Sequence, residues 1–386
     1  MPFATRTAHL KPEGAYQVLA RANQLEAEGK EIIHFEIGQP DFDTLENVSQ
    51  AGIDAIRSGK TRYTPPAGMA SLREVLAEDA GQRRGIEIDP DEVVVSPGGK
   101  PNLFFPTLAL IESGDEVIYP NPGFPTYEAM IKVAGGIPVA VPLLEENGFS
   151  FDLDAFDKLI NERTKLIILN SPSNPTGGVI PLEDLEHIAS QSERYDCWVM
   201  SDELYTRIVY NELEAPSIAT LPGMRKRTII VDGFSKTYAM TGWRLGYGIM
   251  PLELATRVGL LLTHSIGSTA HFTQIAGIEA VTGPQEMAKA MVEEYTLRRD
   301  VIVNGLNTIP GFSCQKPQGA FYAFPNITGT GMSSTELANL ILEKAGVALL
   351  PGNSFGQFGE GYLRLSYANS IENIKKGIER ILTVLS

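Results

Sequence analysis

The middle of the chain alternates short apolar runs with stretches of helical pattern. The runs, rich in Val and Ile, predict strands at Glu92–Ser96, Asp115–Pro120, Lys165–Asn170, Cys197–Asp202, Thr228–Asp232 and Leu245–Met250. Between two of them, apolar residues recur at helical spacing and predict a helix over Leu182–Tyr195. Apolar strands that alternate with helices indicate an α/β fold with a mostly parallel sheet, covered on both faces.

The pattern changes in the last hundred residues. A long helix is predicted over Gln285–Leu306, then an apolar run at Gly319–Phe324, a helix over Ser334–Ala345, a strand at Tyr362–Ala368 and a terminal helix. This order is typical of a second, smaller α+β domain. The helix predicted over Ala15–Glu28 is expected to join it. We therefore predict an N-terminal segment, 1–46, that packs with a small domain, 286–386, and a large domain, 47–285.

Length, composition and charge narrow the possible partners. A chain of 386 residues with 43% hydrophobic and 20% charged residues is a folded protein, too long for one ordinary core. Its net charge of −15 disfavours nucleic acid and anionic membranes as partners, because both require a basic face. A small anionic ligand, held by a few local cations and backbone amides, remains compatible with this charge.

Cysteine usage and hydropathy indicate a soluble protein of the cytoplasm. The two cysteines, Cys197 and Cys314, are too few for a disulfide framework or a four-thiolate metal site, and no metal is predicted. The stretch Val258–Ile278 lacks Asp, Glu, Lys and Arg but contains polar residues and two His, which makes it too polar for a membrane span. The N-terminus has no apolar stretch of signal-peptide length.

Unusual residues follow five of the predicted strands. In strand order they are Gly98, Gly99 and Lys100; Phe124; Asn174; Asp202 and Tyr205; and Lys236. The carboxyl ends of parallel strands lie at one edge of a sheet, where such folds bind ligands. These residues are therefore expected to line one crevice.

Taken singly, each of these features has a structural explanation. Glycines after a strand usually make a turn, Asp202 can cap a following helix, and Phe124 can belong to the core. Arg244 and Arg364 can form surface ion pairs, and Lys236 can extend its ammonium group into water. Only their combination favours a functional site.

Together the residues fit the chemistry of pyridoxal 5'-phosphate (PLP). A lysine amine forms a Schiff base with this aldehyde. The cofactor also needs an anion at its ring nitrogen, donors at its ring oxygen, a phosphate cradle and a stacking side chain. These needs are met, in that order, by Asp202; by Tyr205 and Asn174; by Gly98, Gly99, Lys100 and Arg244; and by Phe124.

Several motifs resemble those of the fold-type I PLP-dependent enzymes. They are IGQPDF (Ile37–Phe42), YTPPAGMASLR (Tyr63–Arg73), SPGGK, NPGFPTY, NSPSNPTGG, SDELY, FSKTYAMTGWRLGY and YLRLSYA. Their order is most similar to the class I/II aminotransferase family, in its aspartate, alanine and aromatic branch. The resemblance implies a large PLP-binding domain with a mostly parallel sheet, plus a smaller α+β domain.

The resemblance also implies roles for single residues. Lys236 would carry the Schiff base and then shuttle the proton, while Asp202 would hold the ring nitrogen. Arg364 would bind the substrate α-carboxylate, with help from Asn174 and the Gly38 backbone. The phosphate, the ring oxygen and the ring face would be held by the residues already assigned to them. Tyr63 would reach the phosphate of the neighbouring subunit, which implies a homodimer with shared active sites.

The chain departs from the family pattern at two places. Many relatives have a serine phosphate ligand three residues before the lysine, where this chain has Gly233. No arginine occurs between Arg257 and Arg298, the region that supplies a second carboxylate clamp in one aspartate-specific branch. Lys100 could serve a second substrate carboxylate instead, or point away, so the amino donor and acceptor stay open.

The resulting prediction is a PLP-dependent aminotransferase that moves an amino group from an L-amino acid to a 2-oxo acid, such as 2-oxoglutarate, by a ping-pong mechanism. A carbon–sulfur β-lyase is an alternative, because the same Schiff base serves several bond cleavages. A non-catalytic PLP-sensing regulator is a second alternative. It would need a basic DNA-binding domain, for which the acidic chain leaves little room.

Overall fold

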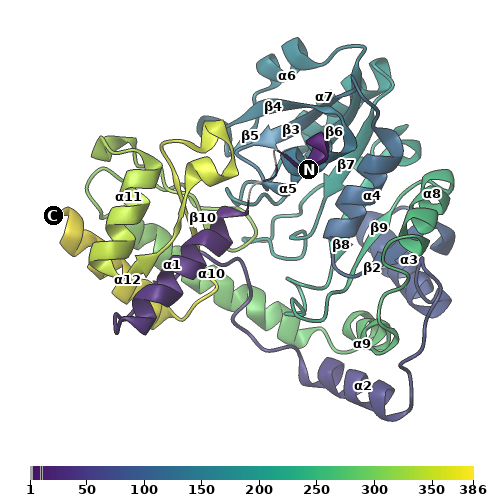
Figure 1. The fold of residues 1–386 in the computed structure, drawn as a ribbon, viewed down its shortest axis with the longest axis horizontal. Coiled ribbons are helices and arrows are strands. Elements are labelled where there is room, and N and C mark those ends of the chain that lie inside the picture. Colours follow the sequence, from purple (N-terminus) through teal and green to yellow (C-terminus); the bar gives the residue numbers. More distant parts are fainter. Residues whose placement is uncertain (1–2, 9, 11) are drawn as a thin grey trace.

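The centre of the structure is an eight-stranded sheet (Figure 1). This computed structural model describes residues 3–8, 10 and 12–386, so residues 1–2, 9 and 11 of the predicted N-terminal segment lie outside it. The strand order is β2-β9-β8-β7-β6-β3-β4-β5. The bounds are β2 Val93–Ser96, β3 Glu116–Asn121, β4 Ile137–Leu144, β5 Ser150–Phe151, β6 Thr164–Asn170, β7 Trp198–Asp202, β8 Thr228–Gly233 and β9 Gly246–Ile249.

The sheet is mostly parallel, as predicted. Strands β8, β7, β6, β3 and β4 pair in parallel, whereas β9 is antiparallel to both β8 and β2. No α-helix separates β8 from β9, so the chain cannot cross back over the sheet as a parallel neighbour would require. Because β9 is antiparallel to both of its neighbours, β2 runs in the same direction as β8. The carboxyl ends of β2, β3, β6, β7 and β8 therefore share one edge.

Helices cover both faces of this sheet. On β6, Leu166 and Ile168 face a core with α4, α5 and α8, whereas Ile167 faces a core with α6 and α7. At the β2–β9 end, α3 and α9 complete the second face. The bounds are α2 Glu46–Arg57, α3 Ala70–Arg84, α4 Lys100–Leu110, α5 Thr126–Ala134, α6 Leu153–Leu159, α7 Leu182–Arg194, α8 Leu252–Thr263 and α9 His271–Thr282. Strands buried on both faces explain the continuous apolar runs of the sequence.

The C-terminal part of the chain surrounds a separate hydrophobic core. Its small sheet has the order β10-β13-β12, and a second pair joins β1 to β11 in parallel. The strands are β1 Ile33–His34, β10 Tyr322–Ala323, β11 Val347–Ala348, β12 Leu350–Pro351 and β13 Leu363–Ser366. The helices are α1 Gly14–Ala27, α10 Glu286–Leu306, α11 Ser334–Leu340 and α12 Ile371–Leu385, and α11 continues as a π-helical turn, Ile341–Ala345.

The N-terminal helix packs on these C-terminal elements. Ala22 and Leu25 of α1 share a buried cluster with Leu342 and Ala348, and Figure 1 shows α1 close to the C-terminal helices. The remaining helical turns are short 3-10 segments at Thr5–Thr7, Pro90–Glu92, Glu145–Asn147, Ile218–Thr220, Met224–Lys226, Thr328–Thr330, Gly352–Phe355 and Gln357–Gly359. In the described part of the chain, no helix is both long and apolar enough to cross a lipid bilayer.

Candidate active site

Lys236 lies in the turn after β8, at the shared carboxyl edge of the sheet. It is partly buried, and its ammonium group donates a hydrogen bond to the carbonyl oxygen of Gly38. Burial, followed by the nearby charges of Arg364 and Arg244, lowers the pKa of Lys236 to about 7, although Asp202 opposes this shift. A substantial fraction of the amine is therefore neutral near pH 7, which is the form that attacks an aldehyde.

Asp202 ends the neighbouring strand β7 and is buried. The hydroxyl of Tyr127 donates to its Oδ2 at 2.6 Å, and the amide of Leu204 donates to its Oδ1 at 3.3 Å. Burial raises the pKa of Asp202 to about 6, although the hydrogen bond from Tyr127 acts in the opposite direction. A turn rather than a helix follows β7, so a helix cap does not explain this carboxylate. Its surroundings fit a cationic partner.

Tyr205 and Asn174, the two predicted donors to a ring oxygen, are both fixed by polar contacts. The hydroxyl of Tyr205 lies 2.6 Å from that of Tyr322. The side chain of Asn170 accepts from the Asn174 amide at 2.9 Å and donates to the Asp202 carbonyl at 3.1 Å. Asn170 therefore connects the backbone of Asn174 to that of Asp202, whereas the Tyr205 hydroxyl contacts Tyr322.

Sequence reasoning missed Tyr127 and Tyr322. Neither stands in a loop after a strand: Tyr127 lies within α5, and Tyr322 begins β10. The IGQPDF motif contains Gly38, but the sequence alone does not connect Gly38 with Tyr322. A Cβ atom at Gly38 would lie 2.2 Å from the Tyr322 hydroxyl, so a larger residue would require Tyr322 to shift. That constraint is visible only in three dimensions.

Gly98, Gly99 and Arg244 form a concentrated group of donors beside the lysine. Gly98 has a φ of 87°, and a Cβ atom there would lie 2.3 Å from Nη2 of Arg244. Gly99 precedes α4 without a side-chain cap, which leaves the positive helix end open to an anion. Arg244 also has a positive φ, 54°, and donates to the Thr241 carbonyl at 2.9 Å. This arrangement fits a phosphate group.

The structure gives a reason for the glycine that replaces the expected serine. Gly233 is buried, and a Cβ atom there would lie 3.2 Å from Cδ1 of Leu204 and 3.3 Å from the Cα of Gly246. Both distances are tighter than ordinary carbon contacts, so a serine would require its neighbours to shift. The phosphate group would thus rely on Arg244 and backbone amides rather than on a hydroxyl at this position.

Arg364, on β13, is a buried cation without an acidic partner among the described residues. Its Nη1 donates to Oδ1 of Asn174 at 3.4 Å, its Nη2 donates to the carbonyl oxygen of Glu36, and its Nε has no partner. The guanidinium also lies over the rings of Tyr322 and Phe355, at 4.6 and 5.1 Å from their centroids. Burial lowers the pKa of Arg364. A buried, unpaired guanidinium is suited to bind a carboxylate.

Lys100 and Phe124 lie together, but the lysine has a partner that the sequence did not suggest. Its ammonium group forms an ion pair with Glu13, which precedes α1, and lies 5.2 Å from the centre of the Phe124 ring. The Phe124 ring packs edge-on against Tyr127 at 5.7 Å. Tyr63 is different from the other predicted residues: it is 97% exposed, and its hydroxyl makes no hydrogen bond within the described ranges.

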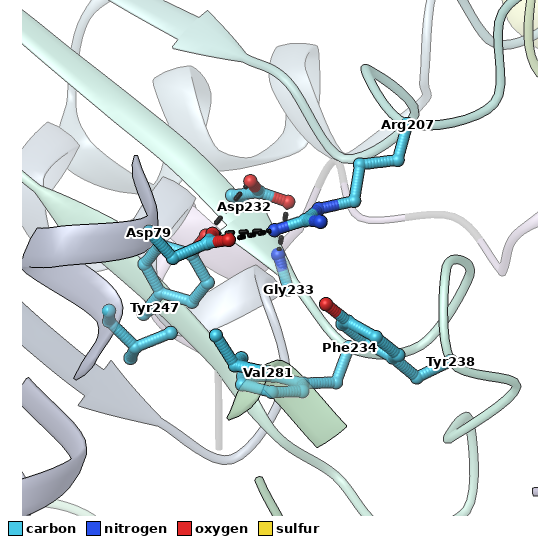
Figure 2. Close-up of a pocket in the computed structure, with 9 residues that line it drawn as sticks. Asp79, Arg207, Asp232, Gly233, Phe234, Tyr238, Tyr247 and Val281 are labelled. Carbon is cyan, nitrogen blue, oxygen red and sulfur yellow. Dashed lines mark hydrogen bonds and ion pairs between the residues drawn. The ribbon is translucent and has the colours of Figure 1, made fainter. Parts of the chain in front are cut away.

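A second group of charged residues includes Glu203, next to Asp202 in the chain, and Figure 2 shows three of its members, Asp79, Arg207 and Asp232. Arg84 binds Glu203 at 2.6 Å, Arg83 binds Asp232 at 3.0 Å, and Arg207 binds Asp79 at 2.5 Å. The hollow drawn in Figure 2 is lined by Asp79, Arg207 and Asp232 together with Phe234, Tyr238, Tyr247 and other residues. Three carboxylates balance three guanidinium groups here, so we treat this group as structural.

Comparisons with known proteins agree with this geometry. The family pattern "Aminotransferase class I and II" matches residues 30–381. The "Probable aspartate/prephenate aminotransferase" of Aquifex aeolicus is 40% identical over 389 residues, covering 99% of this chain and 98% of that protein. The aspartate aminotransferase of Thermus thermophilus with maleate superposes with a TM-score of 0.94 at 38% identity, over 100% of both chains. The aromatic aminotransferase of Pyrococcus horikoshii gives 0.90 at 38% identity, over 95% and 98%.

The chain therefore belongs to the class I and II aminotransferase family. It is a PLP-dependent aminotransferase with the fold type I architecture. The predicted family, fold, enzyme class and cofactor are confirmed. The comparisons do not test the individual site residues, which remain predictions with the geometry described above.

Proposed function

We propose that Lys236 holds PLP through its amine in a ping-pong transfer from an L-amino acid to a 2-oxo acid such as 2-oxoglutarate. When bound, PLP supplies an electron sink that stabilises negative charge at the substrate α-carbon. Once released from the cofactor, the amine of Lys236 would accept the proton from the substrate α-carbon. It would then donate this proton to a carbon of the cofactor. The observation that carries this proposal is the lowered pKa of Lys236, beside the unpaired Arg364.

The other residues hold the cofactor. Asp202 pairs with the ring nitrogen, and its hydrogen bond from Tyr127 fixes the orientation of the carboxylate. Tyr205 and Asn174 donate to the ring oxygen, and Phe124 stacks on the ring. The phosphate is assigned to Gly98, Gly99, Lys100 and Arg244. The position of Arg244 supports this last assignment, because its guanidinium lies close to Gly98, beside the uncapped start of α4.

Arg364 is assigned to the α-carboxylate of the substrate. Its side chain is already fixed by Asn174 and by the Glu36 carbonyl, so little conformational entropy is lost on binding. The Gly38 carbonyl, which accepts from Lys236 in this structure, is released when the amine engages the cofactor. The backbone of Gly38 then becomes available to the substrate.

We further propose a cytoplasmic homodimer with shared active sites. The exposed ring of Tyr63 supports this assembly, because a phosphate ligand of a neighbouring subunit would project from its own chain in this way. Both cysteines are buried and free, in keeping with a reducing compartment. The division at residues 46 and 285 also remains a prediction. Light scattering of the PLP-loaded protein measures the assembly, and a monomer would contradict it.

The reaction type is tested by following the cofactor spectrum. The PLP-loaded protein is mixed with single amino acids in the absence of a 2-oxo acid. An aminotransferase accumulates pyridoxamine phosphate, and later addition of 2-oxoglutarate or pyruvate restores the PLP spectrum. Steady release of pyruvate and ammonia with an unchanged cofactor would instead indicate the β-lyase. A panel of aspartate, alanine and aromatic donors then defines the substrate range.

A further inference from the structure

Glu36 is a buried acidic residue to which the proposed reaction gives no role. It lies two residues after β1, its exposed fraction is 0%, and its Oε2 forms no hydrogen bond with any residue that the structure describes. The backbone carbonyl of the same residue accepts from Nη2 of Arg364. A buried carboxylate normally has partners for both of its oxygens, because water cannot solvate it. The unpaired oxygen of Glu36 therefore requires an explanation.

His34 holds the other oxygen of this carboxylate. Its Nδ1 lies 2.8 Å from Oε1 of Glu36, and its Nε2 lies 3.2 Å from Oε1 of Glu26 on α1. Ionised carboxylates only accept hydrogen bonds, so both ring nitrogens must donate, as they do in a protonated histidine. The hydrogen bond to Glu36 raises the pKa of His34 to about 9, although burial acts in the opposite direction. The imidazole is therefore a cation at neutral pH.

Arg364 is a second cation within electrostatic range of Glu36. Burial lowers the pKa of Arg364, and Glu36 is among the groups that oppose this effect. The Nε of Arg364 is buried and has no partner in the described chain, as is true of Oε2 of Glu36. Two unpaired groups of opposite charge thus belong to residues that already touch through a backbone carbonyl. Lys376 and Arg380 of α12, which packs on this segment, both bind Glu31 instead.

We propose that His34 is a positioning residue that holds the Glu36 carboxylate away from Arg364, which keeps the guanidinium free for the substrate α-carboxylate. This inference rests on the proposed function, which assigns Arg364 to that carboxylate. When the imidazole is removed or neutral, Glu36 turns to Arg364 and pairs with it. The substrate must then displace an internal anion. Its apparent affinity falls in proportion to the fraction of molecules in which Arg364 is still free.

The first test separates substrate binding from chemistry in the PLP-loaded protein. The cofactor spectrum is followed as the first half-reaction is saturated with the best donor among aspartate, alanine and phenylalanine, which gives a dissociation constant and a limiting rate. His34→Met should raise the dissociation constant about tenfold and change the limiting rate by less than about twofold, because only the availability of Arg364 is altered. Adding Glu36→Gln should return the constant to within about twofold of the wild-type value, because no competing carboxylate remains.

His187→Met is the matched control. Nε2 of His187 lies 2.7 Å from Oδ1 of Asp157 and its side chain is 34% exposed, against 33% for His34, but this pair joins α7 to α6. It should change neither the dissociation constant nor the limiting rate. PLP content and thermal unfolding are measured first, so that only folded, equally loaded variants are compared. An unchanged dissociation constant in His34→Met, or no recovery when Glu36→Gln is added, would overturn the proposal.

A pH series provides a second test that leaves His34 in place. In the wild-type protein, the dissociation constant of the donor should rise as the pH passes about 9, where His34 loses its proton. Glu36→Gln keeps the other titrating groups of the site but has no carboxylate to release, so its constant should rise less. Superimposable profiles of the two proteins would overturn the proposal.

Arg364→Met tests the proposed function separately. Unchanged donor binding in this variant would reject the assignment of Arg364 to the α-carboxylate. Weaker binding in Arg364→Met, together with unchanged binding in His34→Met, would keep that assignment and reject only the role of His34.

Discussion

Two groups of charged residues lie side by side at the carboxyl edge of the sheet, and they are organised in opposite ways. Arg84, Glu203 and their neighbours are paired at 2.5–3.0 Å and have no net charge. Lys236, Arg244 and Arg364 have no acidic partner in the described chain. Members of the two groups are close along the chain: Glu203 is next to Asp202, and Asp232 lies near the end of β8, four residues before Lys236.

The difference separates a structural use of charge from a binding use. Paired buried ions contribute little net stability but are costly to break, because a lone charge is left without solvent. Unpaired cations instead lower each other's proton affinity and favour anionic ligands. The charge-balanced network holds Glu203, next to Asp202, and Asp232, four residues before Lys236. We expect the phosphate and carboxylate groups of bound ligands to neutralise the positively charged site.

The largest expected effect comes from removing the reactive amine. Lys236→Ala should lower kcat by about 10³-fold or more, because both the covalent attachment and the proton transfer are lost. The cofactor-free protein should not lose stability, since the variant removes a desolvated cation. Steady-state kinetics and thermal unfolding measure the two effects. A variant that kept full turnover would rule out Lys236 as the reactive lysine.

Breaking the charge-balanced network around Glu203 should lower stability and have little effect on kcat. Arg84→Met leaves the Glu203 carboxylate buried with only hydroxyl partners from Ser201 and Ser217. We expect a loss of about 3–5 kcal/mol in the free energy of unfolding, measured by urea denaturation. The kcat of the folded, PLP-loaded variant should change far less than in Lys236→Ala. Arg57→Met, which removes an exposed pair with Asp54, is the control and should cost less than about 1 kcal/mol.

The smallest effect concerns the pH dependence of the lysine. In the cofactor-free protein, the rate of covalent PLP binding should rise with pH around a midpoint near 7, followed by absorbance. The folded-state pKa lies below the ordinary value of 10.5, so the folded protein binds fewer protons than the unfolded chain between these values. The contribution of Lys236 to the free energy of unfolding should therefore be lowest below pH 7 and should increase towards pH 10.5. A midpoint near 10.5 for the rate of PLP binding would contradict the lowered pKa of Lys236. Arg364→Met should shift this midpoint upwards, because it removes a nearby positive charge that lowers the pKa.

Much of the sheet could be predicted from the sequence, because its strands are buried on both faces. The six predicted strands agree with the structure to within one residue at each end. Strand β4 was missed because Pro138 and Pro142 interrupt it and several of its residues are only partly buried. Prolines are tolerated there because β4 lies near the edge and pairs on its outer side only with the short strand β5. The antiparallel direction of β9 was also not evident from its apolar run.

The candidate site was predictable only where function leaves local motifs. Asp202 ends β7, while Asn174 and Lys236 follow β6 and β8 within a few residues. All three belong to distinctive motifs, and they lie at the same edge of the sheet. Glu13 carried no such signal, because its partner Lys100 is far along the chain and the contact depends on how α1 packs. Distant contacts of this kind follow from the complete fold rather than from any short stretch of sequence.

The pairing of β1 with β11 determines when the site can form during synthesis. Phe35 donates to the Ala348 carbonyl and accepts from Ser366, while the carbonyls of Glu36 and Gly38 receive Arg364 and Lys236. A ribosome makes these early residues long before Arg364. At about 5–20 residues per second, the early segment waits on the order of tens of seconds, with Phe35 unburied. The nascent chain is therefore inactive until its last strand emerges, and this interval is when chaperone protection has the greatest value.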